Sequence, residues 1–119
     1  MKEGQITVKE VLNMPGDNAQ VELVNGKIIS RAKTTTNHQL IVGELMQIIY
    51  RHLKLQETYE EVLSFVPTIL DDYNMFLPDL LVVSDKEKID NDTGCVGVPD
   101  WIIEVSDPES REYCFCKKV

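Results

Sequence analysis

The sequence predicts an α+β domain in which helices flank a mixed β-sheet, and three kinds of segment carry that prediction. Two apolar runs, 78–83 and 99–105, each begin with Pro-Asp and have the composition of buried strands. An Asn-Gly dipeptide divides 21–30 into two strand-like halves, the pattern of a β-hairpin. The segment from His38 to Leu55 has apolar residues at helical spacing. The resulting order of helix, hairpin, long helix, three strands and final helix is typical of an α+β fold.

The composition indicates one soluble domain spanning residues 1–119. Hydrophobic residues make up 43% of the chain and charged residues 27%, which suits a single core. No apolar stretch is long enough for a transmembrane helix, and the N-terminus lacks a leader-like apolar region, so we expect a cytoplasmic protein without a membrane partner. Cys95, Cys114 and Cys116 lack zinc-ligand spacing and are interpreted as reduced thiols.

The N-terminal elements have clear local signals. Thr7 followed three residues later by Glu10 is a capping box, which predicts a short helix ending before Pro15. The hairpin consists of strands 21–24 and 27–30, because Asn-Gly supplies the positive φ angles of a type I′ turn. Alternation places Glu22 on one face of its strand, where the side chain meets either water or a pocket.

The long helix over 38–55 has a broad apolar stripe that predicts packing against the core. His38 lies near its start and His52 near its end, too far apart to share a metal ion. Either histidine can be structural or solvated. Of the two, His38 is the better functional candidate because the loop before it can face a cleft.

The second half of the chain is rich in strand signals. We expect one strand over 62–70, at an edge or with a bulge because it contains Pro67. Asp71 and Asp72 belong to a turn, where carboxylates bond the local backbone more often than a metal ion. The polar stretch between the two Pro-Asp strands predicts a long loop. A final helix is expected from Asp107 onward, with Pro108 in its first position.

The two Pro-Asp strands contain the candidate site. If they are neighbours, Asp79 at the mouth of one strand approaches Glu104, which lies within the apolar run of the other. A carboxylate among apolar residues needs compensation, and a divalent cation shared with a second carboxylate supplies it. Glu104 has two other interpretations: it faces solvent on a one-sided strand, or it pairs with a Lys or Arg.

The charge of the chain limits its partners. The formal net charge of −8 and pI near 4.7 argue against a large basic surface for a phosphate backbone. The same charge concentrates divalent cations near clustered carboxylates. The negative charge of the chain therefore argues against binding of DNA more than against binding of a metal ion.

In this order the motifs resemble the Uma-two family of restriction-endonuclease-like proteins, within the PD-(D/E)xK nuclease superfamily. The resemblance implies a restriction-endonuclease-like core in which Asp79 and Glu104 bind Mg²⁺ or Mn²⁺ and hydrolyse phosphodiester bonds of DNA. Glu22 matches a further acidic position, which implies a third metal ligand. The resemblance covers nearly the whole chain from Val8 to Lys118, and the segments that carry it are 21–27, 38–45, 78–80 and 98–106.

The chain departs from the family pattern in two ways. Ser106 stands where the superfamily has a catalytic lysine, and the resemblance implies that Lys118 on the final helix replaces it. Alternatively, Lys117 and Lys118 only favour the C-terminal end of the helix dipole. Family members also continue into at least one further strand, so the chain is expected to be a C-terminally truncated domain.

Two functions from different classes follow. The first is a metal-dependent endonuclease; the second is a catalytically inactive remnant that acts as an interaction module. We also expect a homodimer through the sheet edge near Glu104, because a missing strand would leave that edge unpaired. A terminal helix that covers the edge would instead leave a monomer.

Overall fold

The structure is a computed structural model that describes residues 4–14, 21–31 and 35–106. The expected final helix from Asp107 lies outside these residues. The elements in chain order are α1 (Val8–Leu12), β1 (Val21–Val24), β2 (Lys27–Ser30), α2 (Thr36–Leu55), β3 (Glu61–Leu63), β4 (Thr68–Asp71), β5 (Asn74–Phe76), β6 (Leu80–Val83), a 3₁₀ turn (Lys86–Lys88), β7 (Ile89–Asp90), β8 (Gly94–Val96) and β9 (Trp101–Ile103). The predicted combination of helices with a mixed sheet is confirmed.

The larger sheet has six strands in the order β2-β1-β5-β4-β8-β7. Its pairs are antiparallel except for β4 and β8, which run parallel, so the sheet is mixed. The predicted hairpin is confirmed, with φ of 50° at Asn25 and 77° at Gly26. The predicted capping box at Thr7 and Glu10 is also present and begins α1, which packs on this sheet.

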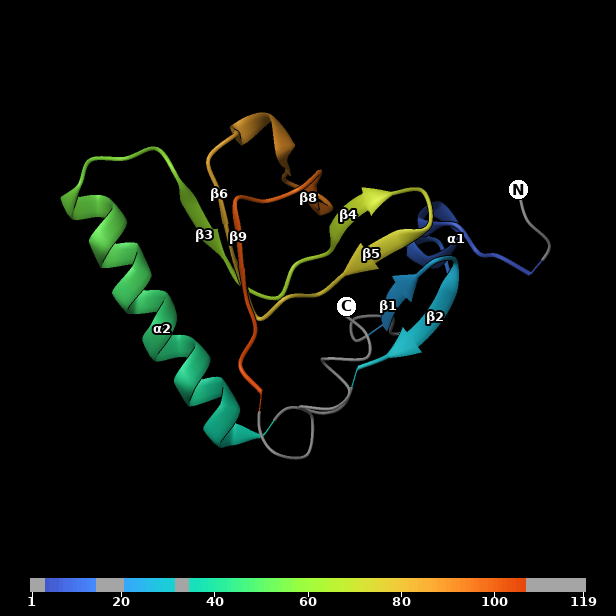
Figure 1. The fold of residues 1–119 in the computed structure, drawn as a ribbon, viewed down its shortest axis with the longest axis horizontal. Helices are drawn as coiled ribbons and strands as arrows, with labels where there is room; N and C mark the ends of the chain where they lie inside the picture. The colour runs from blue at the N-terminus through green and yellow to red at the C-terminus, as the bar shows by residue number, and fades with distance from the viewer. Residues whose placement is uncertain (1–3, 15–20, 32–34, 107–119) are drawn as a thin grey trace.

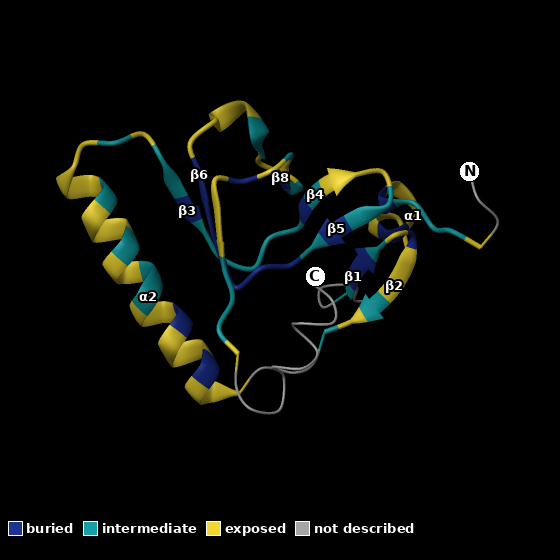
Figure 2. Cartoon of the chain, in the orientation of Figure 1, coloured by how far each residue is buried: buried dark blue, intermediate teal, exposed yellow. Residues whose placement is uncertain are grey.

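The smaller sheet has the order β3-β6-β9 and is covered by α2 (Figure 1). Val42 of the helix packs with Leu80 and Val82 of β6, while Leu81 and Val83 point to a second core cluster with Cys95. Because both faces of β6 are covered, all of its residues are buried, whereas the outer face of α2 is exposed (Figure 2). The apolar run of β6 in the sequence reflects this two-sided burial.

The prediction of one strand over 62–70 is wrong. Its two halves form β3 and β4, which belong to different sheets. Between them Phe65 has φ of 52°, a conformation that no regular strand contains, and Pro67 has no amide hydrogen for a ladder bond. The expected loop between the Pro-Asp strands also contains regular structure, because β7 and β8 form a short antiparallel pair within it.

The turn at Asp71 and Asp72 is as predicted. The Tyr73 amide donates to Asp71 Oδ1 at 2.8 Å, and Asn74 donates to both carboxylate oxygens of Asp71. These hydrogen bonds, that of the Asn74 side chain foremost, lower the pKa of the exposed Asp71 carboxyl. Asp71 therefore bonds its own turn.

The two Pro-Asp strands are neighbours, as predicted. β6 and β9 pair antiparallel, with Leu80 opposite Ile103. Continuing this register by one residue places Asp79 opposite Glu104, just beyond the ends of the two strands. The sequence placed Glu104 within the apolar run of a strand. In the structure Glu104 directly follows β9, which ends at Ile103. The site is formed where this ladder stops.

The described part of the chain contains no helix that is long and apolar enough to cross a membrane.

Candidate active site

Asp79 and Glu104 meet at one cationic group, the guanidinium of Arg31. Arg31 Nη2 lies 3.0 Å from Asp79 Oδ1 and 3.5 Å from Glu104 Oε2. The three side chains are largely shielded from water, with exposures of 10% for Arg31, 2% for Asp79 and 17% for Glu104. The alternative in which Glu104 pairs with an arginine is therefore the one found.

The second oxygen of Asp79 binds the chain that follows β9. The Val105 amide donates to Asp79 Oδ2 at 2.7 Å, and His38 Nε2 lies 3.2 Å from the same oxygen. His38 Nε2 also lies 2.9 Å from the Val105 carbonyl oxygen. Because a carbonyl oxygen can only accept a hydrogen bond, Nε2 must carry the hydrogen. His38 therefore joins Asp79 to the backbone next to Glu104.

Local structure fixes the position of each of these groups. Thr35 caps α2 by accepting from the His38 amide at 3.1 Å, which places the imidazole at the helix start. The Ser64 hydroxyl donates to the Asp79 carbonyl at 3.0 Å. Arg31 follows β2 directly, its Nη1 donates to the Leu77 carbonyl, and its guanidinium carbon lies 5.4 Å from the centre of the Phe65 ring.

Glu22 lies on β1 with no exposure to solvent, so its side chain does not face water. Its Oε2 accepts a hydrogen bond of 2.7 Å from the Leu77 amide, two residues before Asp79. A buried carboxylate bound to a backbone amide fixes the chain that leads into the site. Among the described residues, no group of three His, Cys, Asp or Glu side chains is arranged to hold a metal ion.

The structure thus brings together two of the predicted site residues, Asp79 and Glu104. Glu22 bonds the Leu77 amide, two residues before Asp79, and Lys118 lies outside the described residues. Ser106, in the expected lysine position, is exposed just beyond Val105. The prediction of a three-carboxylate metal site is therefore not what the described residues display, whereas the carboxylate pair is present.

The carboxylate pair has the chemistry of a Mg²⁺ or Mn²⁺ site. Oxygens of Asp79 and Glu104 already converge on one positive nitrogen, Arg31 Nη2. Mg²⁺ is bound in proteins through one or two carboxylates, with water and phosphate oxygens completing its octahedron. The two side chains therefore fit the requirement for carboxylate ligands to a divalent ion.

Arg31 is the functional candidate that the sequence motifs missed. It lies just after a hairpin and belongs to no recognisable motif, and its partner Asp79 is 48 residues away. One signal was available: a carboxylate beside an apolar strand needs a counter-charge, and a Lys or Arg is one source of it. The sequence did not say which basic residue that would be.

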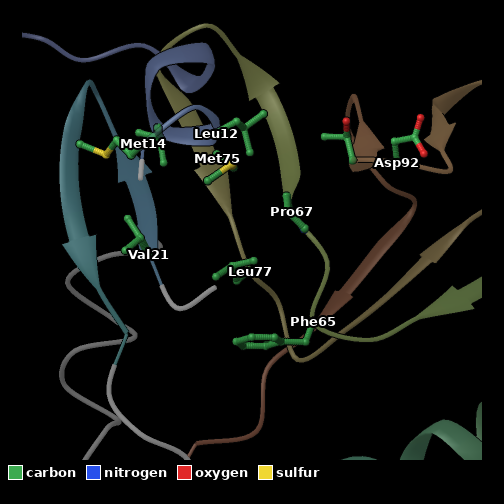
Figure 3. Close-up of a pocket in the computed structure, with 10 residues that line it drawn as sticks. Leu12, Met14, Val21, Phe65, Pro67, Met75, Leu77 and Asp92 are labelled. Carbon is green, nitrogen blue, oxygen red and sulfur yellow. The ribbon is translucent and has the colours of Figure 1, made fainter. Parts of the chain in front are cut away.

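A separate hollow of about 550 Å³ opens beside the site, between α1, β1 and β5. Figure 3 shows Leu12, Met14 and Met75 near α1 and Phe65 at the far end. Phe65 and Leu77 border both this hollow and the Arg31 guanidinium. The hollow is mainly apolar, so its chemistry differs from that of the carboxylate pair. Its lining residues are Val11, Leu12, Met14, Val21, Phe65, Pro67, Met75, Leu77, Asp92 and Thr93.

The model of one protein family, Uma2, described as "Putative restriction endonuclease", matches residues 8–117. The chain belongs to the Uma2 family. The resemblance noted in the sequence is thereby confirmed. No curated protein matches the chain significantly.

A solved relative of the Uma2 chain is a crystal structure described as a putative nuclease belonging to DUF820 from Anabaena variabilis ATCC 29413. The two share 23% sequence identity and superpose with a TM-score of 0.73 over 96% of this chain. The likeness shows a common fold and, with the family match, confirms the predicted restriction-endonuclease-like fold. The Uma2 chain spans 65% of the length of that relative.

Proposed function

We propose that this Uma2 chain is an endonuclease domain that hydrolyses DNA phosphodiester bonds with a divalent ion, Mg²⁺ or Mn²⁺, held by Asp79 and Glu104. The observation that carries the proposal is the convergence of the two shielded carboxylates on a single cationic nitrogen. Family membership and a solved relative described as a nuclease support it. Nucleases with restriction-endonuclease-like folds generally use divalent metals.

Hydrolysis adds water across a phosphorus–oxygen bond. The water oxygen bonds to phosphorus as it loses a proton, and the bond to the leaving sugar oxygen breaks as that oxygen gains one. A divalent ion at the carboxylate pair would polarise the phosphate and acidify the attacking water. Asp79 and Glu104 would hold that ion, and His38 with the Val105 amide orients Asp79. Lys118 is the proposed cation that stabilises the developing charge.

Cleavage of plasmid DNA tests this proposal. We expect nicking by the wild-type chain with Mg²⁺ or Mn²⁺, and its loss with EDTA, in Glu104→Gln and in Asp79→Asn. Asp100→Asn is the matched control, because Asp100 is the aspartate of the second Pro-Asp dipeptide but is exposed. Nicking that survives Asp79→Asn, or that fails equally in Asp100→Asn, contradicts the assignment of the site.

Binding of the metal can be measured without cleavage. Titration calorimetry with Mn²⁺ should give one site in the wild-type chain and at least about tenfold weaker binding in Asp79→Ala, which removes one of two charged ligands. Equal affinity of the two proteins for Mn²⁺ would exclude Asp79 as a ligand.

A second candidate function is that of a non-catalytic interaction module with the same fold. Two observations favour it: Arg31 already pairs with both Asp79 and Glu104, and Ser106 occupies the expected lysine position. The net charge of −8 also opposes binding to DNA. Absence of nicking at every protein and metal concentration would favour this function over the nuclease.

We further propose that two copies associate through β9. Among the described residues β9 lies at the edge of its sheet, and it exposes 57% of Trp101 and 42% of Ile102. An apolar edge strand can extend its sheet with a second copy of itself around a two-fold axis. Sedimentation velocity should show a dimer that Trp101→Lys dissociates and that Leu55→Lys, at an exposed position on α2, leaves intact. A monomer at all concentrations would rule the dimer out.

A further inference from the structure

The positive charge of Arg31 lies beside the two carboxylates that are proposed to bind the metal ion. Its Nη2 atom lies within 3.5 Å of an oxygen from each carboxylate, Asp79 Oδ1 and Glu104 Oε2. A divalent ion held by the carboxylates of Asp79 and Glu104 would lie beside this guanidinium. A guanidinium and an ion of the same sign of charge therefore compete for one pair of ligands.

The guanidinium is held by more than the two carboxylates. Arg31 Nη1 donates to the Leu77 carbonyl, and the face of the Phe65 ring lies 5.4 Å from the guanidinium carbon. With only 10% of its side chain exposed, Arg31 is also poorly solvated. The Leu77 carbonyl and the Phe65 ring therefore hold the guanidinium in place beside Asp79 and Glu104. An incoming ion meets carboxylates that are already paired with a cation.

We infer that Arg31 is a resident counter-cation that competes with the divalent ion for Asp79 and Glu104. The inference rests on the proposed metal site and adds a regulator to it. Without metal, the guanidinium offsets one of the two carboxylate charges and keeps the site assembled. A bound ion would repel the guanidinium and weaken the contacts of Arg31 Nη2 with the carboxylate oxygens, while the Leu77 carbonyl and the Phe65 ring remain available to Arg31. The affinity for metal is therefore set partly by Arg31.

The distinguishing experiment is Mn²⁺ titration calorimetry on the full chain and on Arg31→Gln, with Arg51→Gln, an exposed arginine on α2, as the control. Arg31→Gln removes the competing charge and should bind Mn²⁺ at least about tenfold more tightly than the wild-type chain, because the ion no longer displaces a cation. Arg51→Gln should bind like the wild type. A residue that only supported the fold would give the opposite sign, a weaker affinity in Arg31→Gln.

The outcomes separate this inference from the proposed function. Equal Mn²⁺ affinity in the wild type and Arg31→Gln, with loss of binding in Asp79→Ala, leaves the metal site standing and overturns the role of Arg31. No binding by either protein overturns both. Binding by Arg31→Gln alone supports the inference most strongly.

A second measurement on the wild-type chain covers the case in which Arg31→Gln does not fold. The ¹⁵N-labelled side-chain Nε resonance of Arg31, assigned by its absence from Arg31→Lys, should shift as Mg²⁺ occupies the site. The Arg51 resonance should stay in place. Mg²⁺ binding, detected by calorimetry, that leaves the Arg31 resonance unmoved would contradict the competition.

Discussion

The two Pro-Asp dipeptides of this chain begin neighbouring strands, yet their aspartates have opposite surroundings. Asp79 is 3% exposed, and its carboxylate binds Arg31, His38 and the Val105 amide. Asp100 is exposed and accepts a 2.7 Å hydrogen bond from the Ser84 amide. Hydrogen bonds from the Ser84 hydroxyl and amide lower the pKa of Asp100.

The difference arises from strand direction. Because β6 and β9 are antiparallel, their first residues lie at opposite ends of the ladder. The β6 start meets the end of β9, the residue after β2 and the start of α2, which supply Glu104, Arg31 and His38. At the β9 start, the Asp100 side chain bonds the exposed Ser84 and the Asp100 amide bonds the Val82 carbonyl. The same Pro-Asp dipeptide therefore contributes to the candidate site at Asp79 and is exposed at Asp100. The elements that surround each dipeptide make the difference.

The largest effect on stability should come from Asp79→Ala. The substitution leaves the Arg31 guanidinium shielded from water, with the more distant Glu104 as its remaining ionic partner among the described residues. Breaking such a pair costs about 3 kcal/mol. Urea unfolding followed by tryptophan fluorescence measures this loss. Asp100→Ala should change the free energy of unfolding much less. Equal losses at the two positions would show that the dipeptide, and not its surroundings, determines the effect.

A smaller effect is expected from His38→Ala. It removes the imidazole that joins Asp79 Oδ2 to the Val105 carbonyl, and a buried hydrogen-bonding side chain of this kind contributes about 1–2 kcal/mol. Thermal unfolding of His38→Ala should therefore show a lower Tm than that of His52→Ala, which alters an exposed position on the same helix. A Tm decrease of the same size in both would assign the loss to the helix itself.

The smallest effect concerns acid stability at Asp100. Since its pKa is lower in the folded chain than the usual 3.8, the ionised carboxylate stabilises the fold above that value, and this contribution is lost as pH falls through the folded pKa. Asp100→Asn should therefore reduce the dependence of Tm on pH below about pH 4, and only slightly. An unchanged pH dependence in this variant would show that the Ser84 contacts do not bind the ionised form preferentially.

Sequence patterns were sufficient where a local rule determines the structure. The capping box at Thr7, the Asn-Gly turn and the amphipathic stripe of α2 each depend on neighbouring residues alone, and each was predicted correctly. The pairing of Asp79 with Glu104 was predictable for a related reason. Two apolar strands joined by a polar connection are usually neighbours in one sheet.

Sequence patterns failed where contacts between residues far apart in the sequence determine the structure. The run over 62–70 is strand-like throughout, but the chain turns at Phe65, whose amide bonds the Pro78 carbonyl at 3.2 Å, and enters a second sheet. Arg31 was missed because its role depends on Leu77, Asp79 and Phe65, none of which is near it in sequence. Glu22 was placed correctly on its strand, but its bond to the Leu77 amide required the fold.

The hydrogen bonds of Asp79 also determine when the site can exist during folding. They join it to residues at sequence separations of 26, 41 and 48, the first toward the C-terminus and the other two toward the N-terminus. Closing loops of that length costs entropy before any contact forms, so such contacts form late. A partly folded chain therefore has its carboxylates scattered and without their cationic partner. Whatever chemistry the site performs begins only after the whole fold has closed around Asp79.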